Sequence, residues 1–236
     1  MAKTLPLYGI TDPSNDGDYP VVKSTGLRVL KSASSNGKLG KGKRVFTKGP
    51  WQGMPLYALT LPERLTCPTY CIQWDVCYGD NMPWAKRYRS GPALHRAIRQ
   101  DVETLDDKHG TEGFVVRLHV LGDFHSVPYS RVWLNLLMGY PNLRIFGYTH
   151  RNARGCEIAA ELVRVTRAFP ERFRILSSDR PMQGTKILPV ASTLPAGSSD
   201  PVVGSVICPE QTGATESCLT CGLCCNGKTS ITFLLH

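Results

Sequence analysis

The chain has 236 residues, of which 42% are hydrophobic and 20% charged, and its formal net charge at pH 7 is +9. This size and composition are typical of one globular domain that folds around its own core without help from disulfides or a metal. The start of the chain has no long apolar run behind basic residues, and prolines interrupt the least charged late stretch, residues 187–207. We therefore expect no signal peptide, no membrane span, and a cytoplasmic, reducing setting in which the cysteines are thiols.

Positive charge is concentrated near the start of the chain, since residues 19–62 contain no Asp or Glu. The basic residues of this segment are Lys23, Arg28, Lys31, Lys38, Lys41, Lys43, Arg44 and Lys48. A basic loop rich in Gly and Ser can bind nucleic acid or a phosphate-containing substrate through charge alone; a solvated arm is the alternative. We assign residues 1–53 to a basic arm that packs on or extends from the core, with residues 23–48 as its contact, and residues 54–236 to the main domain.

Strand-like runs and helical patterns alternate from residue 54 onward. The strand-like runs are rich in β-branched and aromatic residues and lie at residues 54–61, 114–121, 143–149, 172–178, 186–192 and 202–208. Apolar residues at helical spacing predict helices at residues 92–108, 128–138 and 156–168. Because strands joined by crossover helices run parallel, we expect an α/β fold with a partial parallel (β/α) barrel of about five or six strands.

Reactive or polar groups directly follow nearly every predicted strand. They are Cys67, Gly122-Asp123, Thr149-His150-Arg151, Ser178-Asp179-Arg180 and Cys208. In parallel sheets and barrels, functional sites form where the carboxyl ends of the strands meet. We therefore expect one shared site, to which two cysteine groups come from distant parts of the sequence.

The first cysteine group consists of Cys67, Cys71 and Cys77, spaced C-x3-C-x5-C. Three thiolates on one loop can each bind one iron of a [4Fe-4S] cubane, which leaves the fourth iron for a non-cysteine ligand or a substrate. A structural zinc site more often has four ligands on paired knuckles. Three buried cysteines that act as small hydrophobic residues are the simpler alternative.

The second cysteine group consists of Cys208, Cys218, Cys221 and Cys224, and Cys225 is an alternative to Cys224. The C-x2-C-x2-C spacing with a remote Cys-Pro resembles a ferredoxin run and favours an iron–sulfur cluster, while four thiolates also suit zinc. In a third arrangement, the first group recruits one thiolate from the second to complete a single cluster. The sequence leaves these three arrangements open.

Taken together, these motifs resemble two families. The three-cysteine loop after the first strand and Gly122-Asp123 after the second resemble radical S-adenosylmethionine (radical SAM) enzymes, although the commoner spacing there is C-x3-C-x2-C. A closer resemblance is to phage-encoded proteins of the gene product 88 family, through the segments CPTYC and CYG of the first group, RLHVLGDFHSVPYSRVW, YTHR, and CPEQ with C-x2-CG-x-C near the end. The radical SAM resemblance implies a partial barrel, S-adenosylmethionine as a cofactor, and Gly122 and Asp123 as the residues that hold its amino group.

Two functional hypotheses follow from this resemblance. In the enzymatic one, the first group holds the cluster that reduces S-adenosylmethionine. The second group holds an auxiliary cluster that relays electrons from an electron donor. In the other, a non-catalytic cluster protein serves electron transfer or binds nucleic acid through the basic segment. A structural zinc protein is a third option. The catalytic residues and the substrate are not indicated by the sequence.

Several further residues have simpler structural interpretations. Cys156, at the start of a predicted helix, is expected to be a structural thiol. His119 is expected on the same side of its strand as Arg117, with a hydrogen-bonded role in the core as the simpler interpretation. Residues 84–89 interleave aromatic and basic side chains, which suits base stacking, but we favour a surface helix with its aromatic residues packed inward.

Overall fold

A computed structural model describes residues 21–22, 28–182, 185, 188–194 and 200–235 of the chain. Within these residues, eight strands form one open sheet, and a short strand β1 (Val21–Val22) pairs with β4 (Arg87–Tyr88). The strands of the large sheet, in spatial order, are β2 (Lys31–Ser32), β3 (Leu56–Ala58), β5 (Phe114–Leu118), β6 (Leu143–Thr149), β7 (Phe173–Ser178), β8 (Val190–Thr193), β10 (Ser230–Phe233) and β9 (Ser205–Ile207). Only β2 pairs antiparallel, with β3, so the mixed α/β class is confirmed, with a mostly parallel sheet that does not close.

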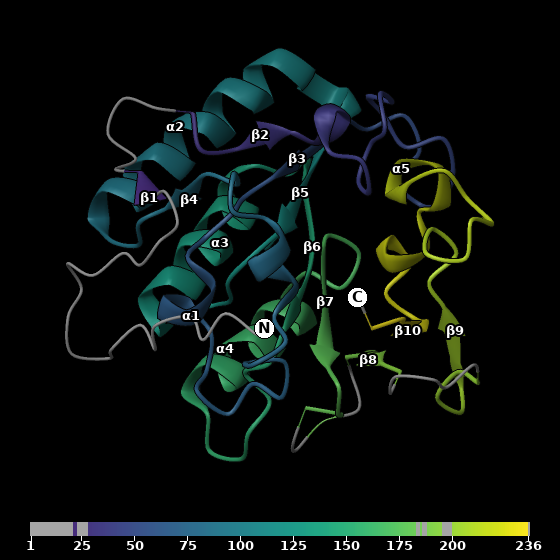
Figure 1. The fold of residues 1–236 in the computed structure, drawn as a ribbon. Coiled ribbons are helices and arrows are strands. Elements are labelled where there is room, and N and C mark those ends of the chain that lie inside the picture. Colours follow the sequence, from purple (N-terminus) through teal and green to yellow (C-terminus); the bar gives the residue numbers. More distant parts are fainter. Residues whose placement is uncertain (1–20, 23–27, 183–184, 186–187, 195–199, 236) are drawn as a thin grey trace.

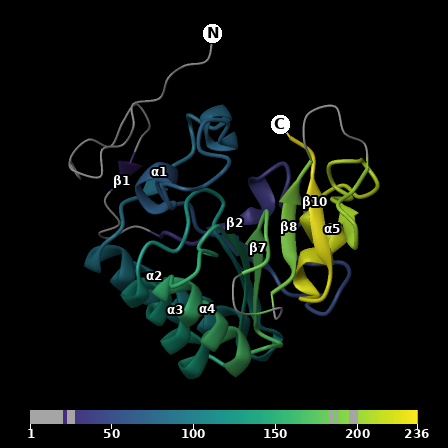
Figure 2. The same cartoon turned by 90° about the horizontal axis from the view of Figure 1, so that it is seen from below.

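Strands β3, β5, β6, β7 and β8 are neighbours in the same order as they occur in the chain. The three predicted helices are present as α2 (Pro92–His109), α3 (Val127–Gly139) and α4 (Glu157–Ala168). Because parallel crossovers are right-handed, connections that always step in the same direction place their helices on the same face of the sheet. Figures 1 and 2 show α2, α3 and α4 together on one side.

The helix-covered face contains the main hydrophobic core. Alternate residues of each strand point to this face, as Val116 and Leu118 of β5 and Ile145 of β6 do. They pack against the apolar side of α2, which includes Ile98 and Val102 at helical spacing. Ser126 caps α3, since its Oγ accepts a hydrogen bond from the Tyr129 amide at 3.2 Å.

The opposite face of the sheet is covered by two segments that are far apart in the sequence. Val115 of β5 and Phe146 of β6 pack there against Trp51 from the N-terminal segment and Leu219 from the C-terminal segment. Leu219 belongs to the short helix α5 (Cys218–Cys221). Backbone hydrogen bonds tie the two covering segments together, because the amides of Cys218 and Leu219 donate to the carbonyls of Lys38 and Leu39.

Two expectations from the sequence need correction here. His119 does not share a face with Arg117, because the strand ends at Leu118 and the His119 Nε2 lies 2.7 Å from the hydroxyl of Tyr129 on α3. Residues 84–89 do not form a helix, and their aromatic residues are not uniformly packed inward, since Trp84 is 74% exposed. None of the helices in the described part of the chain is long and apolar enough to cross a membrane.

Candidate functional site

The carboxyl ends of four neighbouring strands are joined by hydrogen bonds between polar side chains. After β5, the Asp123 carboxylate accepts bonds from the Thr149 hydroxyl at 2.7 Å and from the His150 amide at 2.8 Å, both at the end of β6. The His150 Nε2 lies 2.5 Å from Oδ2 of Asp179, which follows β7, and Oδ1 of Asp179 accepts the amide of Thr193 on β8 at 3.2 Å. The polar residues that follow successive strands therefore meet at one edge of the sheet.

Gly122 and Asp123 lie at this edge of the sheet, next to the first cysteine loop. Gly122 has φ +85°, and a Cβ there would lie 2.5 Å from the hydroxyl oxygen of Thr66, so only glycine allows this close approach. The Asp123 amide donates to the same hydroxyl at 3.1 Å. The Asp123 side chain is only 3% exposed, and burial raises the pKa of its carboxyl, while hydrogen bonds from Thr149, His150 and Phe124 oppose that rise.

The first cysteine group lies on a loop that begins where α1 (Glu63–Thr66) ends. The Cys67 amide donates to the Glu63 carbonyl at 2.7 Å and so closes this helix. Burial raises the pKa of the Cys67 thiol well above its usual range, and the nearby groups of Asp123, Cys71 and Cys77 add to this effect. Burial likewise raises the pKa of Cys77 to about 11. The three cysteines thus lie close enough to influence one another, in a site that disfavours free thiolates.

Arginine side chains hold this loop in place. Arg151, after β6, donates to the Thr66 carbonyl at 2.6 Å and to the Phe124 carbonyl at 2.8 Å. Arg87 forms a two-pronged ion pair with Glu63, with nitrogen–oxygen distances of 2.7 and 2.8 Å. It also donates to the carbonyls of Gly79, Met82 and Ala85. The return path of the loop after Cys77 is therefore fixed by a buried guanidinium.

His150 connects the strand ends to the first cysteine group. Its Nδ1 lies 3.5 Å from the Cys71 Sγ, on the other side of the ring from the Asp179 carboxylate. Burial would lower the pKa of His150, but the hydrogen bonds to Asp179 and Cys71 outweigh it and raise this pKa to about 10. The ring is thus held between a carboxylate and a cysteine sulfur.

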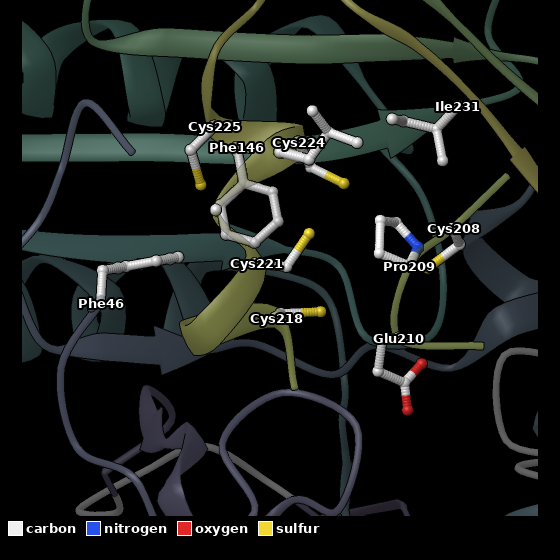
Figure 3. Close-up of a pocket in the computed structure, with 12 residues that line it drawn as sticks. Phe46, Phe146, Cys208, Pro209, Glu210, Cys218, Cys221, Cys224, Cys225 and Ile231 are labelled. Carbon is white, nitrogen blue, oxygen red and sulfur yellow. The ribbon is translucent and has the colours of Figure 1, made fainter. Parts of the chain in front are cut away.

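The second cysteine group surrounds a small cavity against the face of the sheet opposite α2, α3 and α4. The cavity measures about 20 Å³, and Cys208, Cys218, Cys221 and Cys224 line it together with Phe46 and Phe146. Figure 3 shows the sulfur atoms of these four cysteines directed toward a common space, whereas the Cys225 sulfur points away, beside Phe146. Burial raises the pKa of Cys218 to about 12 and that of Cys224 to about 11. The four cysteines predicted from spacing are thus the ones that lie together.

Tyr148 and Arg117, on the same face of the sheet, lie beside the second cysteine group. The Tyr148 hydroxyl donates to the Cys224 Sγ at 3.0 Å, and the Arg117 guanidinium lies 5.5 Å from the centre of the Tyr148 ring. Arg117 is close to Tyr78 of the first loop and to Cys218 and Cys224 of the second group. Within the described residues, its buried Nε has no hydrogen-bond partner. This side chain therefore brings positive charge to the second group and lies near Tyr78, which follows Cys77 in the first loop.

The donor set suits soft metals, because all nine cysteines are free and seven of them lie in the two groups. In the parts of the chain that the structure describes, no three Cys, His, Asp or Glu side chains converge on a point where they could hold a single metal ion. The adjacent guanidinium and the hydrogen bonds to sulfur are groups that can stabilise thiolates.

The remaining predicted residues lie outside the two groups. Cys156 is half-buried beside Met182 and Leu188, which fits a structural thiol. In the basic segment, Lys38 pairs with Glu210 at 3.5 Å and Lys43 with Glu216 at 3.6 Å. The side chains of Lys41, Arg44 and Lys48 are exposed, and Lys23 lies outside the described residues.

Sequence reasoning missed the Glu63–Arg87 ion pair and the central position of Arg117. A charged residue inside a strand-like run was the available signal for Arg117, because such a residue must face a polar partner or a functional site. Arg87 gave no signal, since it lies in a basic segment that reads as exposed surface.

Comparison with known proteins identifies one family. The family whose model matches the chain is described as gene product 88, and the match covers residues 28–167. This range contains the first cysteine group, Gly122-Asp123 and the end of β6, and it ends before the second cysteine group. No curated protein and no solved structure matches the chain.

Proposed function

The chain belongs to the gene product 88 family, and we propose that it is an iron–sulfur protein with two cubane clusters at the carboxyl ends of its parallel strands. The ligands that we propose for the first cluster are Cys67, Cys71 and Cys77, and those for the second are Cys208, Cys218, Cys221 and Cys224. The observation that carries the proposal is that two all-cysteine groups, about 130 residues apart in the sequence, are each contacted from the carboxyl end of β6, Cys224 by Tyr148 and Cys71 by His150 directly after the strand.

The arrangement of the second group supports a cluster rather than a single zinc ion. Four thiolates on one zinc must all lie about 2.3 Å from the same point. In a cubane each thiolate binds a different iron, so the sulfurs surround a volume and do not converge on a point. The C-x2-C-x2-C spacing with the remote Cys208-Pro209 is typical of a cubane, and all four cysteines line one cavity.

The first group supports a more specific proposal, which is radical-SAM-like chemistry. Three cysteine ligands leave one iron of a cubane available, and such an iron can bind and reduce S-adenosylmethionine. The sequential order of β3, β5, β6, β7 and β8, with α2, α3 and α4 on one face, is the winding of a (β/α) barrel, which supports the partial-barrel assignment. We propose that Gly122 and Asp123 border the pocket for the amino group of that cofactor. Because the Asp123 carboxylate already accepts three internal hydrogen bonds, its main task in this scheme is to hold the pocket wall.

Metal and acid-labile sulfide analysis of anaerobically purified protein tests the proposal directly. We expect iron and sulfide for two cubanes, and about half of each after all three ligands of the first group are replaced by serine. A matched control is Cys156→Ser, which should keep the full content, because Cys156 belongs to neither group. Zinc without sulfide would refute the proposal.

The cofactor is tested next, with the reconstituted protein, dithionite and S-adenosylmethionine. Formation of 5′-deoxyadenosine that is lost in the Cys71→Ser variant would establish the enzymatic form. Two intact clusters without this product would leave the non-catalytic form, in which the clusters pass electrons from a donor to an acceptor.

A second candidate function, nucleic-acid binding, is favoured by the exposed side chains of Lys41, Arg44 and Lys48. No carboxylate among the described residues pairs with any of the three, so their charge is available to phosphate groups. If this surface binds nucleic acid, replacing all three by Gln should lower the slope of log affinity against log salt by about 3. The matched control is the triple replacement of Lys86, Lys108 and Lys228, which removes the same charge elsewhere on the surface.

A further inference from the structure

The carboxyl end of β6 and the residue that follows it contact one sulfur atom in each cysteine group. Tyr148 lies in β6, which ends at Thr149, and His150 directly follows the strand. The Tyr148 hydroxyl donates to Cys224 at 3.0 Å, and the His150 Nδ1 lies 3.5 Å from the sulfur of Cys71. A single short stretch, Tyr-Thr-His, therefore touches both proposed ligand sets.

We propose that Tyr148 and His150 are positioning residues that each donate a hydrogen bond to one metal-bound sulfur, Tyr148 to Cys224 and His150 to Cys71. Through these two bonds, Tyr148 and His150 raise the reduction potentials of the two proposed clusters. The inference rests on the proposed function, since it requires that Cys224 and Cys71 are ligands.

The surroundings of Tyr148 fix the direction of its hydroxyl. The ring packs edge-on against Phe233 with 5.6 Å between the ring centres, and Arg117 lies over its face. A tyrosine hydroxyl carries one hydrogen, and that of Tyr148 is directed at the Cys224 sulfur. A thiolate that ligates a metal has no proton of its own and can only accept. The bond must therefore run from the Tyr148 oxygen to the Cys224 sulfur.

His150 is oriented by its other contacts in the same way. Its amide is bound to the Asp123 carboxylate and its Nε2 to the Asp179 carboxylate, so Nδ1 is the ring atom directed at Cys71. A carboxylate and a thiolate are both acceptors, so a ring held between them carries a hydrogen on each nitrogen and is an imidazolium. When Cys71 is a thiolate, the hydrogen between the two atoms must be on Nδ1, and His150 is the donor.

Hydrogen bonds to cysteine sulfurs favour the reduced, more negative state of an iron–sulfur centre. Removing one such bond should make reduction about tenfold less favourable, which is about 59 mV for one electron. The effect should be local, because each donor reaches a sulfur of only one group.

The experiment is a redox titration of the anaerobic holoprotein, followed by electron paramagnetic resonance. Tyr148→Phe removes only the hydroxyl and should lower the potential of the second centre by about 59 mV. His150→Gln keeps an amide near Asp179 but leaves no donor at the Nδ1 position, and it should lower the potential of the first centre. His150→Asn restores a donor at that position and should recover much of the loss. To assign the signals, each variant is also measured in a chain whose other cysteine group has been replaced by serine.

The chain offers a matched control on the helix-covered side of the sheet. The Tyr57 hydroxyl and the His109 Nε2 lie 2.8 Å apart, with neither near a cysteine. Tyr57→Phe and His109→Gln therefore make the same chemical changes without touching a sulfur, and neither should move a potential.

Two results would overturn the inference while the proposed function stands. One is unchanged potentials in Tyr148→Phe and His150→Gln, and the other is equal shifts of both centres in each variant. If analysis finds zinc without sulfide, the proposed function fails. The inference is then decided by the rate at which a chelator removes zinc, which must rise in Tyr148→Phe and His150→Gln but not in the control variants.

Discussion

The ion pair between Glu63 and Arg87 offers the sharpest test of what holds the first cysteine loop. The Arg87 side chain is 1% exposed and that of Glu63 3%, and the guanidinium also donates to three loop carbonyls. Replacing Arg87 by Met leaves the Glu63 carboxylate buried without its countercharge. Breaking a buried pair in this way costs about 3–5 kcal/mol, because the remaining charge is neither solvated nor neutralised. The freed carbonyls push the cost toward the upper end of that range.

Urea denaturation followed by circular dichroism measures this cost as a change in the free energy of unfolding. We expect Arg87→Met to lose about 3–5 kcal/mol, which is a large part of the stability of an ordinary domain. Arg87→Lys keeps the charge but not the two-pronged geometry, and its loss should be intermediate. The matched control is Arg164→Met, because Arg164 pairs with Glu161 while its side chain is 58% exposed, and no measurable change is expected there.

The damage in Arg87→Met should appear at the first cysteine group. Arg87 fixes the loop after Cys77 through Glu63 and through the carbonyls of Gly79, Met82 and Ala85. Iron bound by the first group should therefore be lost from Arg87→Met while iron at the second group is kept. An unfolding free energy within 1 kcal/mol of the unmodified chain would show that this pair does not hold the loop, and so would equal loss of iron from both groups.

Three further predictions concern acid stability, strand packing and ligand choice. Burial lowers the pKa of His125 to about 4. The imidazole therefore takes up a proton near pH 6.5 in the unfolded chain but only near pH 4 in the folded chain. About 3 kcal/mol of stability should be lost as the pH falls from 6.5 to 4. His125→Gln should flatten this part of the pH profile measured by urea denaturation, and an unchanged slope would contradict the assignment. A Cβ on Gly147 would lie 1.5 Å from a carbonyl oxygen of β5, whereas one on Gly139 meets nothing within 4 Å, so thermal denaturation should show severe destabilisation for Gly147→Ala and none for Gly139→Ala. Cys224→Ser should lose the metal of the second group and Cys225→Ser should keep it, as metal analysis of the two purified variants will show; the reverse would exchange their roles.

The sequence was sufficient for the elements whose signals are local. The strand-like runs that became β3, β5, β6 and β7 carry β-branched and aromatic residues throughout, and Pro92 marks the first turn of α2. The spacing of the cysteines was enough to group them, because neighbouring ligands on one loop are a local property. In the second group, both Cys224 and Cys225 line the cavity, and Figure 3 shows the Cys225 sulfur beside Phe146, apart from the other four sulfurs.

Features that depend on distant partners could not be predicted. Strand β10 is short and inserts between β8 and β9, a position set by pairing with residues about 25 to 40 positions earlier in the chain. Arg87 looks like a surface residue, and its burial depends on the carboxylate of Glu63, a partner 24 positions away in the chain. The sheet was expected to curve into a partial barrel; strand order and register establish a mostly parallel sheet that does not close, and its curvature depends on long-range geometry that periodicity does not contain.

The winding of the sheet explains why two remote cysteine groups can share one strand. The crossover helices all lie on one face of the sheet. The other face is therefore available to the N-terminal segment and the C-terminal cysteine segment, which cover it together. The first cysteine group and its supports Asp123, Arg151 and Arg87 all lie within residues 28–167, the range that matches the family. The second group lies outside that range, yet its hydrogen-bond donor, Tyr148, lies inside it. The C-terminal cysteines therefore complete a site whose polar support is already provided by the matched part of the chain.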